Sequence, residues 1–172
     1  MEYSMQAAER RDMGMDPKFE RFKEITSELH RLIGIDQIAL ADDQDGRWIT
    51  DFVLDDVDVG ITYSSVDNPD KAHLLCIFGE VEEFERCEAM LALMRLNFRL
   101  ALAGNASFSI NPVTNQVVLM ASIDVERVDS QSILNSLVRL SEQAHSWRTG
   151  HFLDLATSGE DAYSLCSSGM RA

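Results

Sequence analysis

Apolar and polar side chains alternate in several short stretches of the chain, and this period of two predicts β-strands. The clearest alternation covers residues 57–64, where every second residue is Val, Ile or Tyr. Alternation also predicts strands over 47–54 and 106–110, and 116–125 is expected as the returning strand of a hairpin. A nearly continuous apolar run over 73–78 predicts a strand covered on both faces. Turn residues separate these stretches, so we expect an antiparallel sheet that includes hairpins.

Two other segments have the spacing of amphipathic helices. The first begins with Asp16 as a capping residue before Pro17 and continues to Gly34. The last begins at Asp129 or Ser130 and ends near Arg148, with one apolar stripe along its length. The segment 35–45 between the first helix and the first strand has no clear period, and we expect it to be transitional.

The stretch 84–103, FERCEAMLALMRLNFRLALA, is the longest apolar window without Gly or Pro and predicts a buried helix. On a helical wheel its apolar residues fall into two stripes separated by narrow polar seams. The first stripe contains Phe84, Cys87, Met90, Leu91, Met94, Phe98, Ala101 and Leu102. The second stripe contains Ala89, Leu93, Leu96 and Leu100. A helix with two apolar stripes needs two surfaces to pack against.

We therefore expect the chain to form a homodimer through this central helix. The large aromatic and thioether side chains of the first stripe, with Phe84, Leu91, Met94 and Phe98, suit contact with the protein's own sheet. The second stripe is then the predicted dimer interface, made by Ala89, Leu93, Leu96 and Leu100. In the alternative, both stripes are buried within one subunit.

Composition limits the function classes. The chain has 172 residues, is 45% hydrophobic and carries 15 basic against 29 acidic residues, a net charge of −14. We expect one domain over residues 16–149, with a flexible arm over 1–15 and a mobile tail over 150–172. The acidic surface disfavours nucleic acid and anionic membranes as partners. Three cysteines, no signal peptide and no span free of charges indicate a cytoplasmic protein.

Residue patterns for catalysis or metal binding are absent from the sequence. It contains no phosphate loop, dinucleotide glycine fingerprint, paired-histidine helix or closely spaced cysteine pair. Asp43-x-Asp45-Gly46 matches part of a calcium-binding loop. The last position of such a loop needs an acidic residue that binds calcium through both oxygens, and Phe52 stands there instead. We therefore expect a binding protein, with no catalytic residue, no metal and no cofactor.

The order of elements resembles the class I chaperones of type III secretion systems, the Tir chaperone family. The resemblance covers about residues 19–148 and is most specific in NASFSINPVTNQVVLMASIDVERVDSQSILNSLVRLSEQAHSWR, a hairpin, an acidic connection and a last helix ending in Trp-Arg. FERFKEITSELHRLIGI is similar to the opening helix of the family. The fold implied is α+β, homodimeric, with a twisted antiparallel sheet in the order helix-strand-strand-strand-helix-strand-strand-helix.

The resemblance also implies a function. Such a homodimer would bind the N-terminal segment of one or more secreted effector proteins in extended form without ATP, with the bacterial secretion ATPase as a candidate further partner. For the effector site we expect the first helix and neighbouring strands, with Phe19, Phe22, Ile25, Trp48 and Phe108. These five residues could equally be ordinary core. The alternatives are a small enzyme or ligand-binding domain with a pocket beside the central helix, and a structural adaptor.

Overall fold

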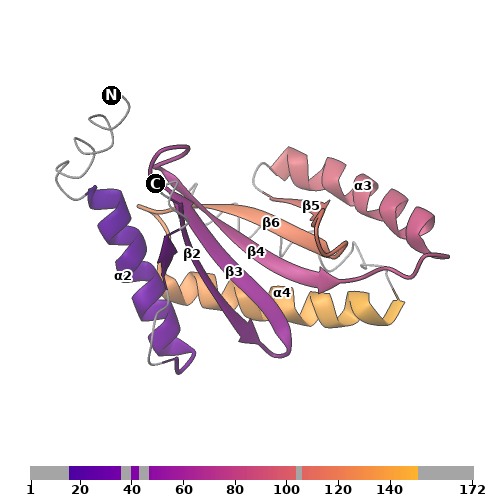
Figure 1. Cartoon of the computed structure of the whole chain (residues 1–172), viewed down its shortest axis with the longest axis horizontal. Helices are drawn as coiled ribbons and strands as arrows, with labels where there is room; N and C mark the ends of the chain where they lie inside the picture. Colours follow the sequence, from indigo (N-terminus) through magenta and orange to yellow (C-terminus); the bar gives the residue numbers. More distant parts are fainter. Residues whose placement is uncertain (1–15, 36–39, 43–46, 104–105, 151–172) are drawn as a thin grey trace, which may run out of the picture.

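A computed structural model describes residues 16–35, 40–42, 47–103 and 106–150 of the chain. The elements follow one another as α2 (Pro17–Leu32), β1 (Ala41–Asp42), β2 (Arg47–Leu54), β3 (Val57–Ser64), β4 (Lys71–Gly79), α3 (Arg86–Ala103), β5 (Ala106–Ile110), β6 (Val117–Asp124) and α4 (Ser130–Gly150) (Figure 1). The predicted arm over 1–15 lies outside the described residues, as does the predicted tail beyond Gly150.

The strands form one twisted sheet in the order β1-β2-β3-β4-β6-β5, and every neighbouring pair is antiparallel. The predicted α+β architecture and order of elements are confirmed, with one addition. The addition is β1, which is only two residues long and pairs with Trp48 and Ile49 of β2. A strand of two residues is too short to show a period, so the segment 35–45 gave no sign of it.

One face of the sheet, which we call the inner face, carries the core of the domain. Its buried side chains come from alternate positions of the strands and include Phe52, Val59, Ile61, Tyr63, Leu74, Phe78, Val117 and Leu119. Both α2 and α4 pack over this face, against each other and against the strands. On the opposite face Val53 and Met120 are exposed, and Leu75 and Ile77 of β4 are half-buried. The prediction that β4 is fully covered on both faces was therefore too strong.

Helix α2 begins and ends where its capping residues predict. The Asp16 side chain accepts a hydrogen bond from the Lys18 backbone N–H at 3.0 Å, and Pro17 occupies the first turn. Past the last turn, Gly34 adopts a φ of 78°, a left-handed conformation that favours glycine. A single buried stripe with Phe22, Ile25 and Leu29 faces the sheet.

Helix α4 supplies most of the cover over the inner face. Asp129 caps it by accepting a hydrogen bond from the Ser132 backbone N–H at 2.8 Å, as the sequence predicts. Its stripe from Ile133 to Trp147 is buried over the whole length of the helix. The Ser130 hydroxyl donates to the backbone oxygen of Ile25 at 3.0 Å, and this bond joins the start of α4 to the middle of α2.

Arg148 in the last turn of α4 makes three hydrogen bonds to the sheet and its turns. The Arg148 guanidinium donates to the backbone oxygens of Phe78 at 2.8 Å, Asp56 at 3.0 Å and Ile77 at 3.1 Å. Asp56 belongs to the tight turn between β2 and β3, and its own φ of 56° is left-handed. Arg148 therefore holds together three segments that are far apart in the sequence: a strand end, a tight turn and a helix end.

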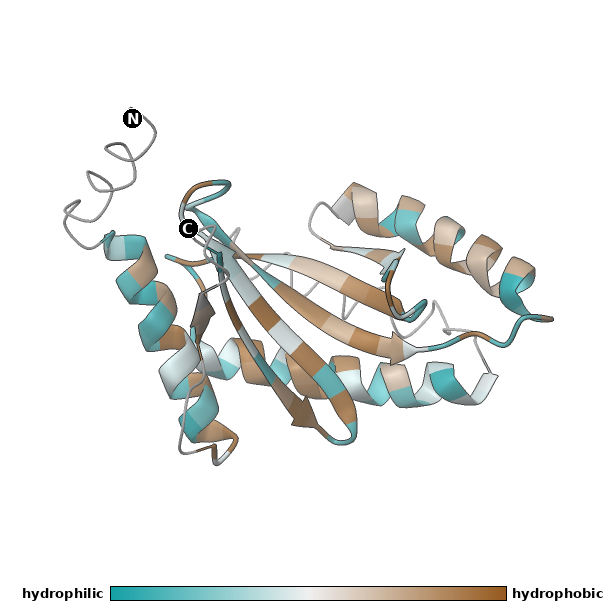
Figure 2. Ribbon diagram, in the orientation of Figure 1, coloured by the Kyte–Doolittle hydropathy of each residue, from teal (hydrophilic) through white to brown (hydrophobic). Residues whose placement is uncertain are grey.

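Helix α3 lies at the far end of the sheet, beside β5 (Figure 1). The prediction of which apolar stripe faces the protein's own sheet and which faces a partner was wrong. The second stripe, predicted as the dimer interface, is buried within the subunit, and Ala89, Leu93, Leu96 and Leu100 are only 2–7% exposed. In the first stripe, predicted as core, Phe84, Leu91, Met94, Phe98 and Leu102 are 51–82% exposed. Cys87 of the same stripe is exposed as well. Hydrophobic colours predominate along α3 in Figure 2, which agrees with two apolar stripes.

The exchange of the two stripes can be measured by a matched pair of substitutions on α3. Leu96→Ala removes a buried side chain and should lower the free energy of unfolding by about 2–5 kcal/mol. Phe98→Ala removes a larger but exposed side chain and should change it by less than about 1 kcal/mol. Urea denaturation of both variants, at a concentration too low for self-association, is the measurement. An equal loss in the two variants would contradict the assignment.

Candidate partner-binding site

Four aromatic side chains gather where the start of α2 meets β2 and β3, and we call them the aromatic cluster: Phe19, Phe22, Trp48 and Tyr63. The ring of Phe19 lies 4.4 Å from that of Trp48 between centroids, and the ring of Phe22 is stacked on Tyr63 at 4.9 Å. Phe22 and Tyr63 are fully buried, whereas Phe19 and Trp48 are half-buried. Phe19 and Trp48 are therefore the part of the cluster that a partner could reach.

The aromatic cluster is held in place by polar contacts at the start of α2. The Tyr63 hydroxyl donates to the backbone oxygen of Pro69 at 3.2 Å and lies 3.3 Å from Asp16 Oδ2. Burial, and then the neighbouring Asp16 carboxylate, raise the pKa of Tyr63 to about 12, so the hydroxyl stays protonated and can donate. An ion pair between Lys18 and Asp70 ties the same turn of α2 to the loop before β4.

Helix α2 also touches β2 near its other end. His30 Nε2 lies 3.1 Å from the Thr50 hydroxyl, and the imidazole meets the Phe52 ring edge-on, with centroids 5.5 Å apart. Burial lowers the pKa of His30, so the side chain is neutral at neutral pH and adds no charge to the core. These contacts hold α2 in a fixed position beside the edge of the sheet.

The backbone of β2 is only partly paired at that edge. On the side of β2 that faces away from β3, β1 covers Trp48 and Ile49. Within the described part of the chain, no strand pairs with residues 50–54 on this side. An edge strand of this kind can accept an extended segment through its backbone hydrogen-bonding groups. Trp48 lies in the paired part, two residues before the unpaired stretch begins at Thr50.

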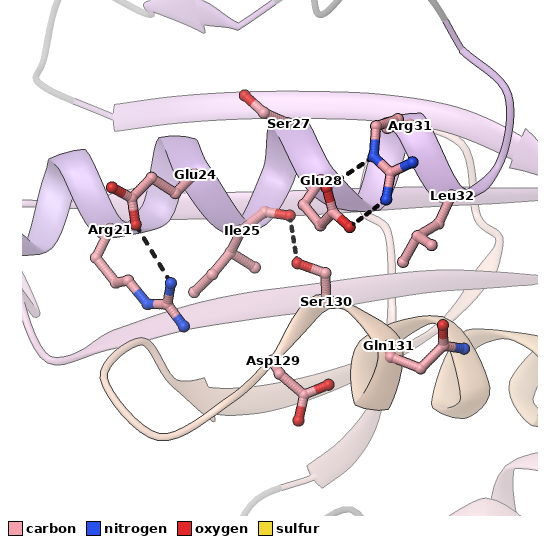
Figure 3. Close-up of a pocket in the computed structure, with 10 residues that line it drawn as sticks. All are labelled: Arg21, Glu24, Ile25, Ser27, Glu28, Arg31, Leu32, Asp129, Ser130 and Gln131. Carbon is pink, nitrogen blue, oxygen red and sulfur yellow. Dashed lines mark hydrogen bonds and ion pairs between the residues drawn. The ribbon is translucent and has the colours of Figure 1, made fainter.

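A hollow lies between α2 and α4 (Figure 3), with a volume of about 630 Å³. Charged side chains line its walls, and several of them already pair with one another. Arg21 lies 3.3 Å from Glu24, and Arg31 lies 2.6 Å from Glu28. Because its walls are charged and mutually neutralised, this hollow is a poorer receptor for an apolar segment than the aromatic cluster.

The structure separates the five residues predicted for the effector site. Phe19 and Trp48 lie side by side and half-buried, whereas Phe22 and Ile25 are buried in the core beneath them. Phe108 lies in β5 at the opposite end of the sheet, where it packs edge-on against Phe78 with centroids 5.0 Å apart. It is 8% exposed and lies far from the first helix, so it cannot share one site with Phe19 and Trp48. Tyr63 was missed, although the alternation of β3 had placed it on the inner face with the other core residues.

Two negative findings concern only the described residues. Within them, no three or more His, Cys, Asp and Glu side chains are grouped closely enough to hold a metal ion. None of the described helices combines the length and the apolar character that a membrane span requires.

Comparisons with known proteins address the fold and the family. A chain of the HopA1-SchA chaperone-effector complex superposes with a TM-score of 0.60 and 12% identity, over 79% of this chain and 99% of that chain. A chain of the ExsC-ExsE complex gives 0.58 and 17% identity over 76% and 93% of the two chains. An uncharacterized protein from Methanothermobacter thermautotrophicus gives 0.51 and 14% identity over 76% and 98%. At such identities these likenesses show a common fold.

The family evidence comes from the sequence. No curated protein matches the chain. Residues 67–148 match the model of the Tir chaperone protein (CesT) family. The matched region runs from the loop before β4 to Arg148, and so includes α3, the β5-β6 hairpin and α4. The match covers a little under half of the chain, and the similarity of this region to the Tir chaperone (CesT) family agrees with the shared fold.

Proposed function

We propose that this protein is a type III secretion chaperone that binds an extended segment of a secreted effector at the β2 edge and keeps it competent for export. One observation carries the proposal: the half-buried Phe19 and Trp48 pair lies two residues from the point where, among the described residues, β2 loses its strand partner on its outer side. Backbone hydrogen bonds to β2 would hold any extended segment, and the aromatic pair would select apolar side chains within it. This combination suits a partner that is bound unfolded.

The family match over residues 67–148 and the chaperone-effector complex among the structural relatives support a binding role over catalysis. The rival hypothesis of a small enzyme or ligand-binding domain requires a pocket beside α3. The hollow described above lies instead between α2 and α4. A structural adaptor would have a folded partner, and this difference separates it from a chaperone experimentally.

The first test captures the partner and asks whether it is unfolded. The tagged chain is purified from its native host, bound proteins are identified by mass spectrometry, and the N-terminal segment of each candidate is then mixed with the pure chain without ATP. Hydrogen exchange should show new protection at the alternate β2 amides between Thr50 and Leu54 that point away from β3, because an added strand would bond to them. A partner that is folded in the complex, or unchanged exchange in β2, would contradict the proposal.

Trp48 should contribute much of the affinity for such a segment. Trp48→Ala should weaken binding by about 2 kcal/mol or more, roughly 30-fold in Kd, because tryptophan is enriched among residues that dominate binding energy. Val113→Ala is the matched control, since Val113 is exposed at the hairpin between β5 and β6, far from β2. Isothermal titration calorimetry of both variants is the measurement. Undiminished affinity in Trp48→Ala would show that the binding site does not include Trp48.

Fluorescence gives an independent reading of the same contact. Trp147 is fully buried beside Phe78, with ring centroids 6.0 Å apart, so its emission should change little on binding. Replacing Trp147 would damage the core. The emission of Trp48 is instead obtained as the difference between the unaltered chain and Trp48→Phe.

We also propose that the chain is a homodimer through the exposed first stripe of α3. Covering Phe84, Leu91, Met94, Phe98 and Leu102 completely would contribute roughly 5–10 kcal/mol per copy. Two-fold symmetry doubles this contribution, which can offset an association cost of about 4–15 kcal/mol. An exposed apolar patch of this kind on a helix is typical of a protein interface.

Met94 is the residue to test, because it lies near the middle of the exposed stripe. Met94→Glu should give a folded monomer, since the new charge would be buried without a partner in the dimer. Val113→Glu places the same charge at an exposed apolar position outside the stripe and should remain dimeric. Light scattering after gel filtration measures the mass, and circular dichroism confirms folding. If Met94→Glu and Val113→Glu have the same mass, the interface is not on this stripe.

A further inference from the structure

The far edge of the sheet is formed by β5, which among the described residues pairs with β6 on one side and with no strand on the other. In this pairing Ala106, Phe108 and Ile110 lie opposite Ala121, Leu119 and Val117. An unpaired strand edge offers backbone N–H and C=O groups to any extended segment, including the same edge of another copy. Unless the outward-facing backbone groups of β5 are covered, this edge can bind the same extended segments as the β2 edge.

One side chain of α3 covers the middle of that edge. The backbone N–H of Phe108 donates to Asn97 Oδ1 at 2.6 Å, and Asn97 Nδ2 donates to the backbone oxygen of Phe108 at 2.9 Å. Both polar groups of one residue are thus satisfied by a single side-chain amide. In an antiparallel pair, two opposite residues exchange the same two bonds. Asn97 therefore occupies the position that a residue of an added strand would take.

The amide is held there by the packing of its helix. The second stripe of α3 is buried against the domain, and two of its members, Leu93 and Leu100, lie one turn before and one turn after Asn97. Asn97 itself is part-buried beside β5. Since β5 has only five residues and Phe108 is the central one, blocking Phe108 leaves no continuous run of open backbone groups.

We propose that Asn97 is a specificity-determining residue that closes the β5 edge to strand addition, so that extended partners pair at the β2 edge alone. The closure of β5 follows from the contacts of Asn97, and only the use of β2 rests on the proposed function. The two edges of the sheet thereby have different roles, one closed by a side chain of α3 and one left open beside the aromatic cluster.

The test replaces Asn97 and measures self-association without any client. Asn97→Leu keeps a similar volume but removes both hydrogen bonds, and the bare β5 edges should pair between copies. Sedimentation velocity should then show species larger than those of the unaltered chain, increasing with concentration. Hydrogen exchange at the Phe108 amide should become at least about tenfold faster in dilute samples. Asn135→Leu, an exposed asparagine on α4, is the matched control and should change neither reading.

A second variant protects the test against misfolding. Asn97→Asp keeps an acceptor for the Phe108 N–H but places a carboxylate against the Phe108 oxygen, and it should associate in the same way as Asn97→Leu. If the folded variant sediments as the unaltered chain does at all concentrations, the proposal is overturned, whatever the exchange rate at Phe108. Because no client is used, failure here leaves the client experiments intact, and failure of those experiments leaves the closure of β5 intact.

Discussion

The structure depends on covering one face of one sheet. The inner face is strongly apolar along β3, β4 and β6, and burial of apolar surface is the dominant favourable contribution to folding. Two helices share the task, with α4 along the central strands and α2 toward the β2 end. Because α2 has a single buried stripe and α4 already occupies the centre, α2 is placed beside the sheet edge, where Phe19 and Trp48 meet. The candidate site is a consequence of how the core is divided.

Local sequence patterns predicted most of the elements. Alternation identified β2, β3 and β5, an apolar run identified β4, and the capping residues Asp16 and Asp129 located the starts of two helices to within a residue. Each of these signals is carried by neighbours in the chain, and the tertiary structure did not override them. The class of fold could be predicted for the same reason, because the order of elements leaves few topologies available.

The errors have a common physical cause, which is that periodicity identifies faces without ranking them. Helix α3 has two stripes of similar hydrophobicity, and the choice between them is made by the shape and polar groups of β5. Asn97 lies in one of the narrow polar seams between the stripes, and only the structure shows that its side chain pairs with the backbone of Phe108. Phe108 was grouped with Trp48 in one expected site, but β3, β4 and β6 separate their strands in the sheet. Contacts of this kind depend on long-range topology.

The position of α4 at the end of the described domain also sets an order of events during synthesis. The helix has 21 residues, and at about 5–20 residues per second a ribosome needs about 1–4 s to add them. Until then the sheet lacks its main cover, and the Arg148 contacts with Phe78 and Asp56 cannot form. During this interval the apolar strands of the nascent chain are exposed to solvent and prone to aggregation. A protein proposed to keep unfolded partners soluble therefore passes through an aggregation-prone state during its own synthesis.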